Sequence, residues 1–179
     1  MKIQELYLPI NVFNDIREKW KHDPVVYQSI LNKITKVLHL YGVRFYLGFG
    51  TLLGAIRDKH FIDNDTDIDL VILECDEERL VEAIQSDAFL ASGLTLIRTH
   101  QEYLLSVSEQ DQYCDLYVFR PKDLNYQCWK YTIEKERLDY PQAINFLGTE
   151  YLIPKDPETY LDRVYGNWHI PAQDHAREI

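Results

Sequence analysis

Residues 63–73, with the sequence DNDTDIDLVIL, place alternating aspartates directly before an apolar run of strand length. A nearly continuous apolar run is typical of a central strand that is buried on both faces. Because side chains at positions i and i+2 of a strand point to the same side, we expect Asp67 and Asp69 to lie together. The segment therefore predicts a sheet with two carboxylates at the start of a central strand.

The rest of the chain predicts helices and further strands around this one. Asp23 and Pro24 form a typical helix start, and Gly42 ends the apolar periodicity that follows them. We expect further helices at 51–58, 76–86 and 157–165, and strands at 43–49, 68–73, 94–99, 103–108 and 113–119. This order predicts an α+β fold in which helices flank a mixed β-sheet.

Composition favours one globular domain, residues 1–179. The chain is 46% hydrophobic, and no repeat or linker divides it. Nineteen Lys and Arg against 29 Asp and Glu give a net charge of −10, which disfavours nucleic acid and anionic membranes as partners. Three cysteines without metal-ligand spacing favour a reducing compartment. Since no apolar run reaches membrane-spanning length, we expect a cytoplasmic protein without membrane insertion.

The paired aspartates predict a metal site. Two carboxylates held close together repel each other unless a cation lies between them, and Mg²⁺ or Mn²⁺ prefers such oxygen ligands. Asp115 lies within another apolar strand segment, YCDLYVF, where it can complete a cluster with Asp67 and Asp69. Such a cluster can clamp the attacking and leaving oxygens at phosphorus, and Asp115 can also deprotonate an acceptor hydroxyl. Asp65 is a further candidate ligand.

A glycine-containing step between a predicted strand and helix adds a candidate phosphate site. Gly50 and Thr51 offer backbone amides and a hydroxyl next to a helix N-terminus. Arg57, about two turns along that helix, carries a guanidinium that suits paired phosphate oxygens, although such an arginine more often forms a surface ion pair.

Other interpretations of the acidic stretch are weaker. A solvated loop explains Asp63 and Asp65, but it does not explain Asp67 and Asp69, which lead straight into the apolar run. A calcium loop of the EF-hand type matches the acidic spacing in part, yet Ile68 stands where that loop requires glycine.

The segment YLGFGTLLGAIRDKHFIDNDTDIDLVI resembles the signature of the LicD/fukutin-related family. The matching positions are Gly50, Thr51, Leu52, Leu53, Gly54, Ala55, Arg57, Phe61, Ile62, Asp65, Asp67, Ile68 and Asp69. The tail IPKDPETYLDRVYGNWHIP resembles the closing segment of the family, with Tyr160, Leu161, Tyr165 and Gly166 at matching places.

The resemblance implies a nucleotidyltransferase-like fold and a metal-dependent phosphotransferase. Such an enzyme moves a phospho-alcohol, of the phosphocholine or polyol phosphate type, from a CDP-activated donor to a glycan or a small-molecule acceptor. Two alternatives stay open at this stage. One is a nucleotidyltransferase that uses a nucleoside triphosphate to modify a small molecule, a protein or an RNA end, and the other is a non-catalytic module that binds nucleotide or metal.

Overall fold

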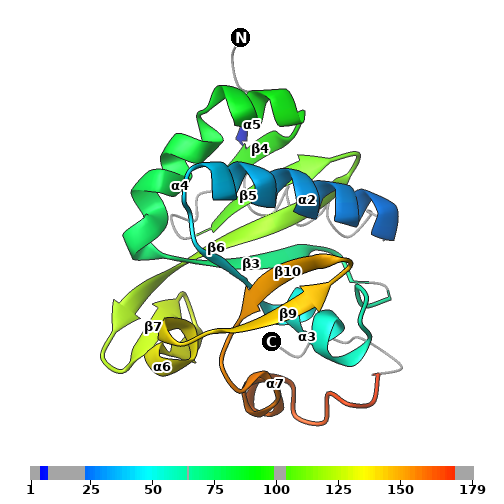
Figure 1. Ribbon diagram of the computed structural model, residues 1–179, viewed down its shortest axis with the longest axis vertical. Helices are drawn as coiled ribbons and strands as arrows, with labels where there is room; N and C mark the ends of the chain where they lie inside the picture. The colour runs from blue at the N-terminus through cyan, green and yellow to red at the C-terminus, as the bar shows by residue number, and fades with distance from the viewer. Residues whose placement is uncertain (1–4, 8–22, 64, 99–103, 172–179) are drawn as a thin grey trace.

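The centre of the fold is a mixed β-sheet, seen in the computed structural model that describes residues 5–7, 23–63, 65–98 and 104–171 (Figure 1). Its strand order is β1-β4-β5-β6-β3-β2. The strands are Glu5–Tyr7 (β1), Phe45–Leu47 (β2), Ile68–Leu73 (β3), Thr95–Arg98 (β4), Leu104–Glu109 (β5) and Gln112–Lys122 (β6). β3 pairs in parallel with β6 and antiparallel with β2, and every residue of β3 is buried. The prediction of a central strand at 68–73 is confirmed.

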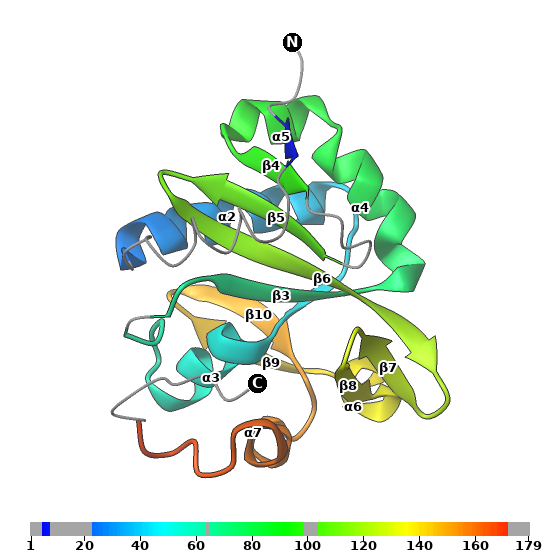
Figure 2. The same ribbon diagram turned by 180° about the vertical axis from the view of Figure 1, so that it is seen from behind.

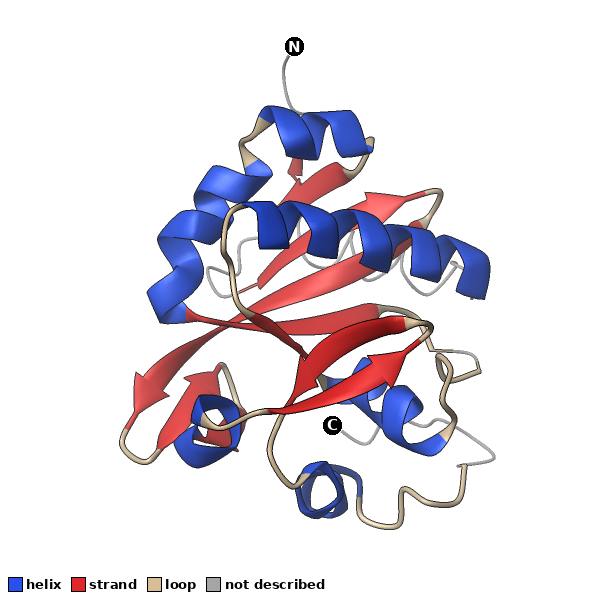
Figure 3. Ribbon diagram, in the orientation of Figure 1, coloured by secondary structure: helices blue, strands red, loops and turns tan. Residues whose placement is uncertain are grey.

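Three helices cover one face of this sheet (Figures 1 and 3). Pro24–Leu40 (α2) packs on β5 and β6, and it also contacts Glu77–Ile84 (α4) and Asp87–Ser92 (α5). As predicted, the Asp23 carboxylate accepts hydrogen bonds from the amides of Val25 and Val26, and Gly42 follows the helix with a φ of +66°. The buried side of α2 includes Ile30, Ile34, Val37 and Leu38.

The remaining elements lie around β2, β3 and the end of β6 (Figure 2). Phe49–Arg57 (α3) packs against β3, and Pro157–Tyr165 (α7) contacts α3. A second sheet, formed by Gln142–Phe146 (β9) and Thr149–Ile153 (β10), lies against β2. Asn125–Cys128 (β7) and Tyr131–Glu134 (β8) form a hairpin on the end of β6, and Lys135–Asp139 (α6) follows it.

The predicted elements are found, with shifted ends. The strand expected at 43–49 shortens to 45–47 because Gly48 already serves as the N-cap of α3. The strands expected at 94–99 and 103–108 reach in part into residues 99–103, which lie outside the described residues. β1, α5, α6 and β7–β10 were not predicted. Within the described ranges, no helix has the length and apolar character that crossing a membrane requires.

Candidate metal centre

Three buried carboxylates meet where β3 and β6 run side by side. Asp67 directly precedes β3, Asp69 lies within it, and the parallel register places Asp115 of β6 opposite Asp69. One carboxylate oxygen of each residue lies within 4.8 Å of those of the other two. Asp67 and Asp69 are 4% exposed and Asp115 is 0% exposed. The structure therefore brings together the three carboxylates that the sequence singled out, and their role as ligands stays a prediction.

This acidic triad, Asp67, Asp69 and Asp115, makes a strongly negative environment inside the protein. Burial raises the pKa of the neighbouring Cys114 thiol well above its ordinary value, and the charges of Asp115, Asp69 and Asp67 raise that pKa further. Buried like charges are costly unless a cation pairs with them. The all-oxygen donor set fits a hard divalent cation such as Mg²⁺ or Mn²⁺.

Two hydroxyl groups hold the carboxylate of Asp115 in place. The Ser106 hydroxyl donates to Oδ1, and the Tyr117 hydroxyl donates to Oδ2 at 3.4 Å. Ser106 stands opposite Asp115 in the antiparallel β5–β6 register, while Tyr117 lies two residues further along β6. Neither residue was predicted from the sequence. The i+2 spacing was available for Tyr117, but only strand pairing identifies Ser106.

Gly50 and Thr51 position Asp69 in this structure. The Gly50 amide donates to Asp69 Oδ2 at 3.0 Å, and the Thr51 hydroxyl accepts from the Asp69 amide at 2.9 Å. A Cβ atom on Gly50 would lie 2.4 Å from Asp65 Oδ2, so any side chain at position 50 would displace the Asp65 carboxylate. That these two residues contact a phosphate stays a prediction.

The other aspartates of the stretch differ from the triad. The Asp65 carboxylate lies close to Gly50 and accepts from the Thr66 amide at 3.0 Å, and the Asp65 carbonyl accepts from the Tyr27 hydroxyl at the same distance. Asp65 is therefore a neighbour of the triad rather than one of the three carboxylates within 4.8 Å. Asp63 is exposed, as expected for a loop residue.

Arg57 connects α3 to the C-terminal segment. Its Nε and Nη2 atoms donate to the carboxylate of Asp58 at 2.8 and 2.7 Å, and its Nη1 atom donates to the carbonyl of Trp168 at 3.1 Å. This arrangement matches the ion-pair interpretation of Arg57. Its role as a phosphate ligand stays a prediction.

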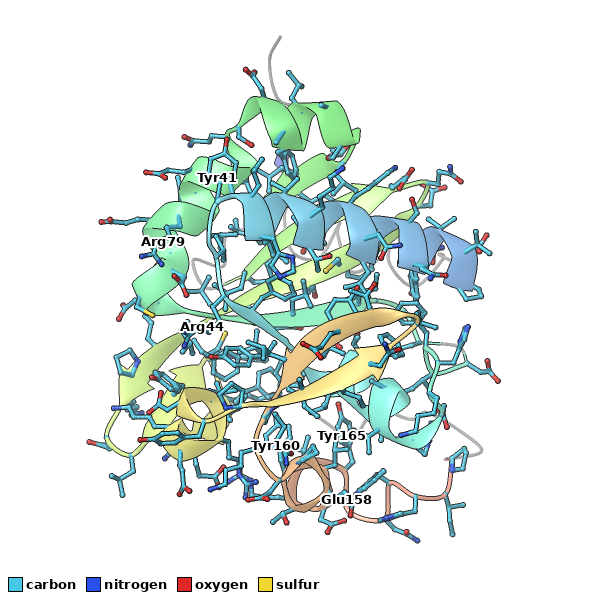
Figure 4. The ribbon with its side chains drawn as sticks, viewed as in Figure 1. Tyr41, Arg44, Arg79, Glu158, Tyr160 and Tyr165 are labelled. Carbon is cyan, nitrogen blue, oxygen red and sulfur yellow. The ribbon has the colours of Figure 1, made fainter. Side chains whose placement is uncertain are left out.

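The C-terminal helix α7 contributes tyrosines on the side of the triad. Figure 4 shows Tyr160 and Tyr165 extending from α7 toward the body of the protein. Although Tyr165 is 40% exposed, partial burial raises the pKa of its hydroxyl, and the negative charges of Asp69, Asp65 and Asp67 contribute to this rise. The pKa of Tyr160 is also raised, first by burial and in part by Asp69. The tail that resembled the closing segment of the family therefore lies within electrostatic reach of the triad.

Comparison with known proteins identifies a matching family and similar solved structures. The family model described as LicD/FKTN/FKRP, nucleotidyltransferase domain, matches residues 42–156. No curated protein matches the chain. The solution structure of the antibiotic-resistance factor ANT(2'')-Ia aligns with 15% identity and a TM-score of 0.54, over 83% of this chain and 80% of that chain.

Two other solved structures align less well. The crystal structure of ANT(2'')-Ia with adenylyl-2''-tobramycin has 15% identity and a TM-score of 0.49, over 75% of this chain and 76% of that chain. Terminal uridylyl transferase 4 from Trypanosoma brucei with bound GTP has 13% identity and a TM-score of 0.36, over 61% of this chain and 34% of that chain.

The family model covers more than half of the chain and includes β3, α3 and Asp115. At its level of identity, the likeness to ANT(2'')-Ia concerns the fold alone, and it agrees with a nucleotidyltransferase-like α+β architecture. The chain therefore belongs to the LicD/FKTN/FKRP family of nucleotidyltransferase domains and, with it, to the transferases.

Proposed function

We propose that the protein is a divalent-metal-dependent transferase that moves a phospho-alcohol group, of the phosphocholine or polyol phosphate type, from a CDP-activated donor to a glycan or similar acceptor. The observation that carries this proposal is the buried triad Asp67, Asp69 and Asp115, whose oxygens lie within 4.8 Å in a member of the LicD family.

The carboxylates of the triad would hold Mg²⁺ or Mn²⁺. When bound, such a cation neutralises charge on the donor phosphates and polarises the phosphorus centre. The chain itself orients the ligands. Gly50 and Thr51 fix Asp69 against α3, and the hydroxyl donors on β5 and β6 fix Asp115. Pre-set ligands need no reorganisation during reaction, which is the usual source of electrostatic catalysis.

Asp115 is the candidate that accepts the proton of the acceptor hydroxyl. Its carboxylate is fully buried and held by Ser106 and Tyr117, so its orientation is defined before a substrate binds. A general base has to lie within hydrogen-bond reach of the proton that it removes, so the acceptor hydroxyl would have to bind next to the fixed Asp115 carboxylate.

The proposal is tested by incubating the protein with CDP-choline or a CDP-polyol, a glycan acceptor and Mg²⁺, and measuring CMP release and acceptor modification. Asp67→Asn and Asp69→Asn should each abolish turnover while the proteins stay folded. Asp63→Asn makes the same change on an exposed loop residue and should retain activity. Full activity in either triad variant would refute the site.

The same assay separates the alternatives. Pyrophosphate release from a nucleoside triphosphate, with no CMP release from CDP-alcohols, would identify a nucleotidyltransferase reaction instead. Nucleotide binding without turnover of any donor would identify a non-catalytic module.

A further inference from the structure

Four aromatic residues form a strip that begins at the acidic triad. Tyr117, whose hydroxyl donates to Asp115, packs against Phe49 with ring centroids 4.9 Å apart. Tyr131 packs on Phe49 at 4.7 Å and lies 6.3 Å from Tyr117. Trp129 follows at 5.9 Å from Tyr131. The aromatic strip, defined as Tyr117, Phe49, Tyr131 and Trp129, therefore leads from the triad to the protein surface.

The strand order explains why this strip reaches the site. β7 runs antiparallel to β6, with Gln127 opposite Arg120, so β7 returns along β6 in the direction of Asp115. Figure 2 shows this hairpin beside the end of β6. Residues 129 and 130 form the two-residue turn that joins β7 to β8, since Cys128 pairs with Tyr131. The turn is thereby brought close to the surface that carries Tyr117.

Trp129 occupies its position against two ordinary preferences. Its φ is +51°, a conformation that favours glycine or asparagine at the first position of such a turn. Its side chain is 57% exposed, although tryptophan is usually well buried. The Lys130 ammonium lies 4.8 Å from the centre of the Trp129 ring. Neither the backbone conformation nor core packing favours tryptophan at this position. Residues with such unusual backbone conformations cluster at ligand sites.

We propose that the nucleobase of the nucleotide donor stacks on a platform, the Trp129 ring, beside which Tyr131 stands at an interplanar angle of 77°, while the donor phosphates lie at the acidic triad. This assignment rests on the proposed function only in taking the donor to be a nucleotide. Every nucleobase offers a flat π face to aromatic side chains, and Lys130 can donate to a base carbonyl beside them.

The position of the platform favours a base over an acceptor sugar. Tyr131 and Trp129 lie one and two ring spacings beyond Tyr117, the ring that contacts Asp115. In a nucleotide donor, a ribose and the phosphate chain separate the base from the reacting phosphorus, and the proposed pose lays this length along the strip between the triad and Trp129. A chain with a net charge of −10 also gains from placing Lys130 near an anionic ligand.

The test compares binding of CMP, UMP, AMP and GMP with binding of ribose 5-phosphate, which lacks a base, in Mg²⁺ by calorimetry. The key variant is Trp129→Gly, because glycine suits a φ of +51° and keeps the turn folded. Asp123→Gly is the matched control, since Asp123 has a φ of +50° in the neighbouring turn between β6 and β7. Trp129→Phe keeps a ring at the site.

In the wild type, at least one nucleoside monophosphate should bind more tightly than ribose 5-phosphate. Trp129→Gly should weaken that nucleotide about tenfold, as expected for one lost stacking ring, and leave ribose 5-phosphate unchanged. Asp123→Gly should behave like the wild type, and Trp129→Phe should restore most of the affinity.

Three results would overturn the platform. Trp129→Gly could leave nucleotide affinity unchanged, every monophosphate could bind no better than ribose 5-phosphate, or the variant could raise only the KM for the glycan acceptor. CMP release from a CDP-alcohol by the wild type, together with any of these results, would leave the proposed function standing. The two proposals can therefore fail separately.

Discussion

Replacing Asp67 by asparagine tests whether the triad is built for a cation. The variant keeps the shape of the side chain and removes one of three charges whose oxygens lie within 4.8 Å. At an effective dielectric constant of about 20, two unit charges at that distance repel by about 3.5 kcal/mol, and Asp67 takes part in two of the three pairs. Relaxation of the site reduces the net repulsion, so one such pair is taken as its upper bound.

Without metal, Asp67→Asn should therefore be more stable than the wild type by about 1–4 kcal/mol, or roughly 2–4 °C of melting temperature per kcal/mol in a domain of this size. A cation at 100 times its Kd should add about 2.7 kcal/mol to the wild type. The variant, with one ligand lost, should gain less than half of that shift. Adding metal should thus shift the stability difference toward the wild type by more than about 1.3 kcal/mol.

The assay is thermal unfolding in EDTA and in excess Mg²⁺ or Mn²⁺. Asp63→Asn is the control, because it removes the same charge from an exposed loop residue and should follow the wild type in both conditions. Equal melting temperatures of wild type and Asp67→Asn in EDTA, with equal shifts on adding metal, would refute the reasoning.

Further predictions concern the core, the thiols and alkaline pH. Gly54→Ala would place a Cβ 2.5 Å from the carbonyl oxygen of His60. The free energy of unfolding in urea should therefore fall by about 1–3 kcal/mol. A rise of about 1 kcal/mol, as expected from helix propensity alone, would show that the backbone moves to relieve the contact. Only the exposed Cys75 should react with a thiol reagent in the native protein, since the other two cysteines are buried; rapid reaction of more than one thiol would contradict this. Burial and the hydrogen bond to Asp139 raise the pKa of Tyr126 from 10.0 to about 12. The folded state therefore favours the protonated hydroxyl of Tyr126. The folding stability that this gives is fully present below about pH 10 and is lost as the pH rises toward 12. Urea unfolding midpoints measured across that range will check this loss.

The triad could be predicted because each of its residues stands out from its own stretch of the sequence. Asp67 and Asp69 have the spacing of one strand face, and Asp115 interrupts an apolar strand where an unpaired carboxylate is costly. What the sequence does not contain is the register. That Asp69 lies opposite Asp115 depends on parallel pairing of β3 with β6, and that Ser106 reaches Asp115 depends on β5 as well.

The segment between β6 and α7 was the least predictable part. Its strands β7 to β10 are short, and β7 and β9 are mostly only half-buried or exposed, so they lack the alternating pattern that identifies a half-buried strand. Their positions follow from pairing with β6 and from packing on β2. Trp129 shows the same limit, because its nearness to Tyr131 and the triad follows from a hairpin that no local pattern announces.

Arg57 shows how a correct motif can leave a role open. Its place in the helix after Gly50 and Thr51 matched the family, yet its guanidinium binds Asp58 and the carbonyl of Trp168. In this structure it ties α3 to the segment that follows α7. Because α3 also carries Gly50 and Thr51, which contact Asp69, Arg57 can affect the site through the position of this helix without touching a ligand.

The buried negative charge links folding to cation binding. The triad lies on strands β3 and β6, whose neighbouring residues are mostly buried and apolar. Its negative charges raise the pKa of the Cys114 thiol beyond the rise that burial causes. The fixed donors around it, the Gly50 amide and the Ser106 hydroxyl, orient the carboxylates but do not neutralise them. The proposed cation would bind only the folded chain, in which strands β3 and β6 are paired, so its binding free energy would add to the stability of that pairing. The same arrangement that makes the metal-free site costly would therefore make a bound cation a structural element of the sheet.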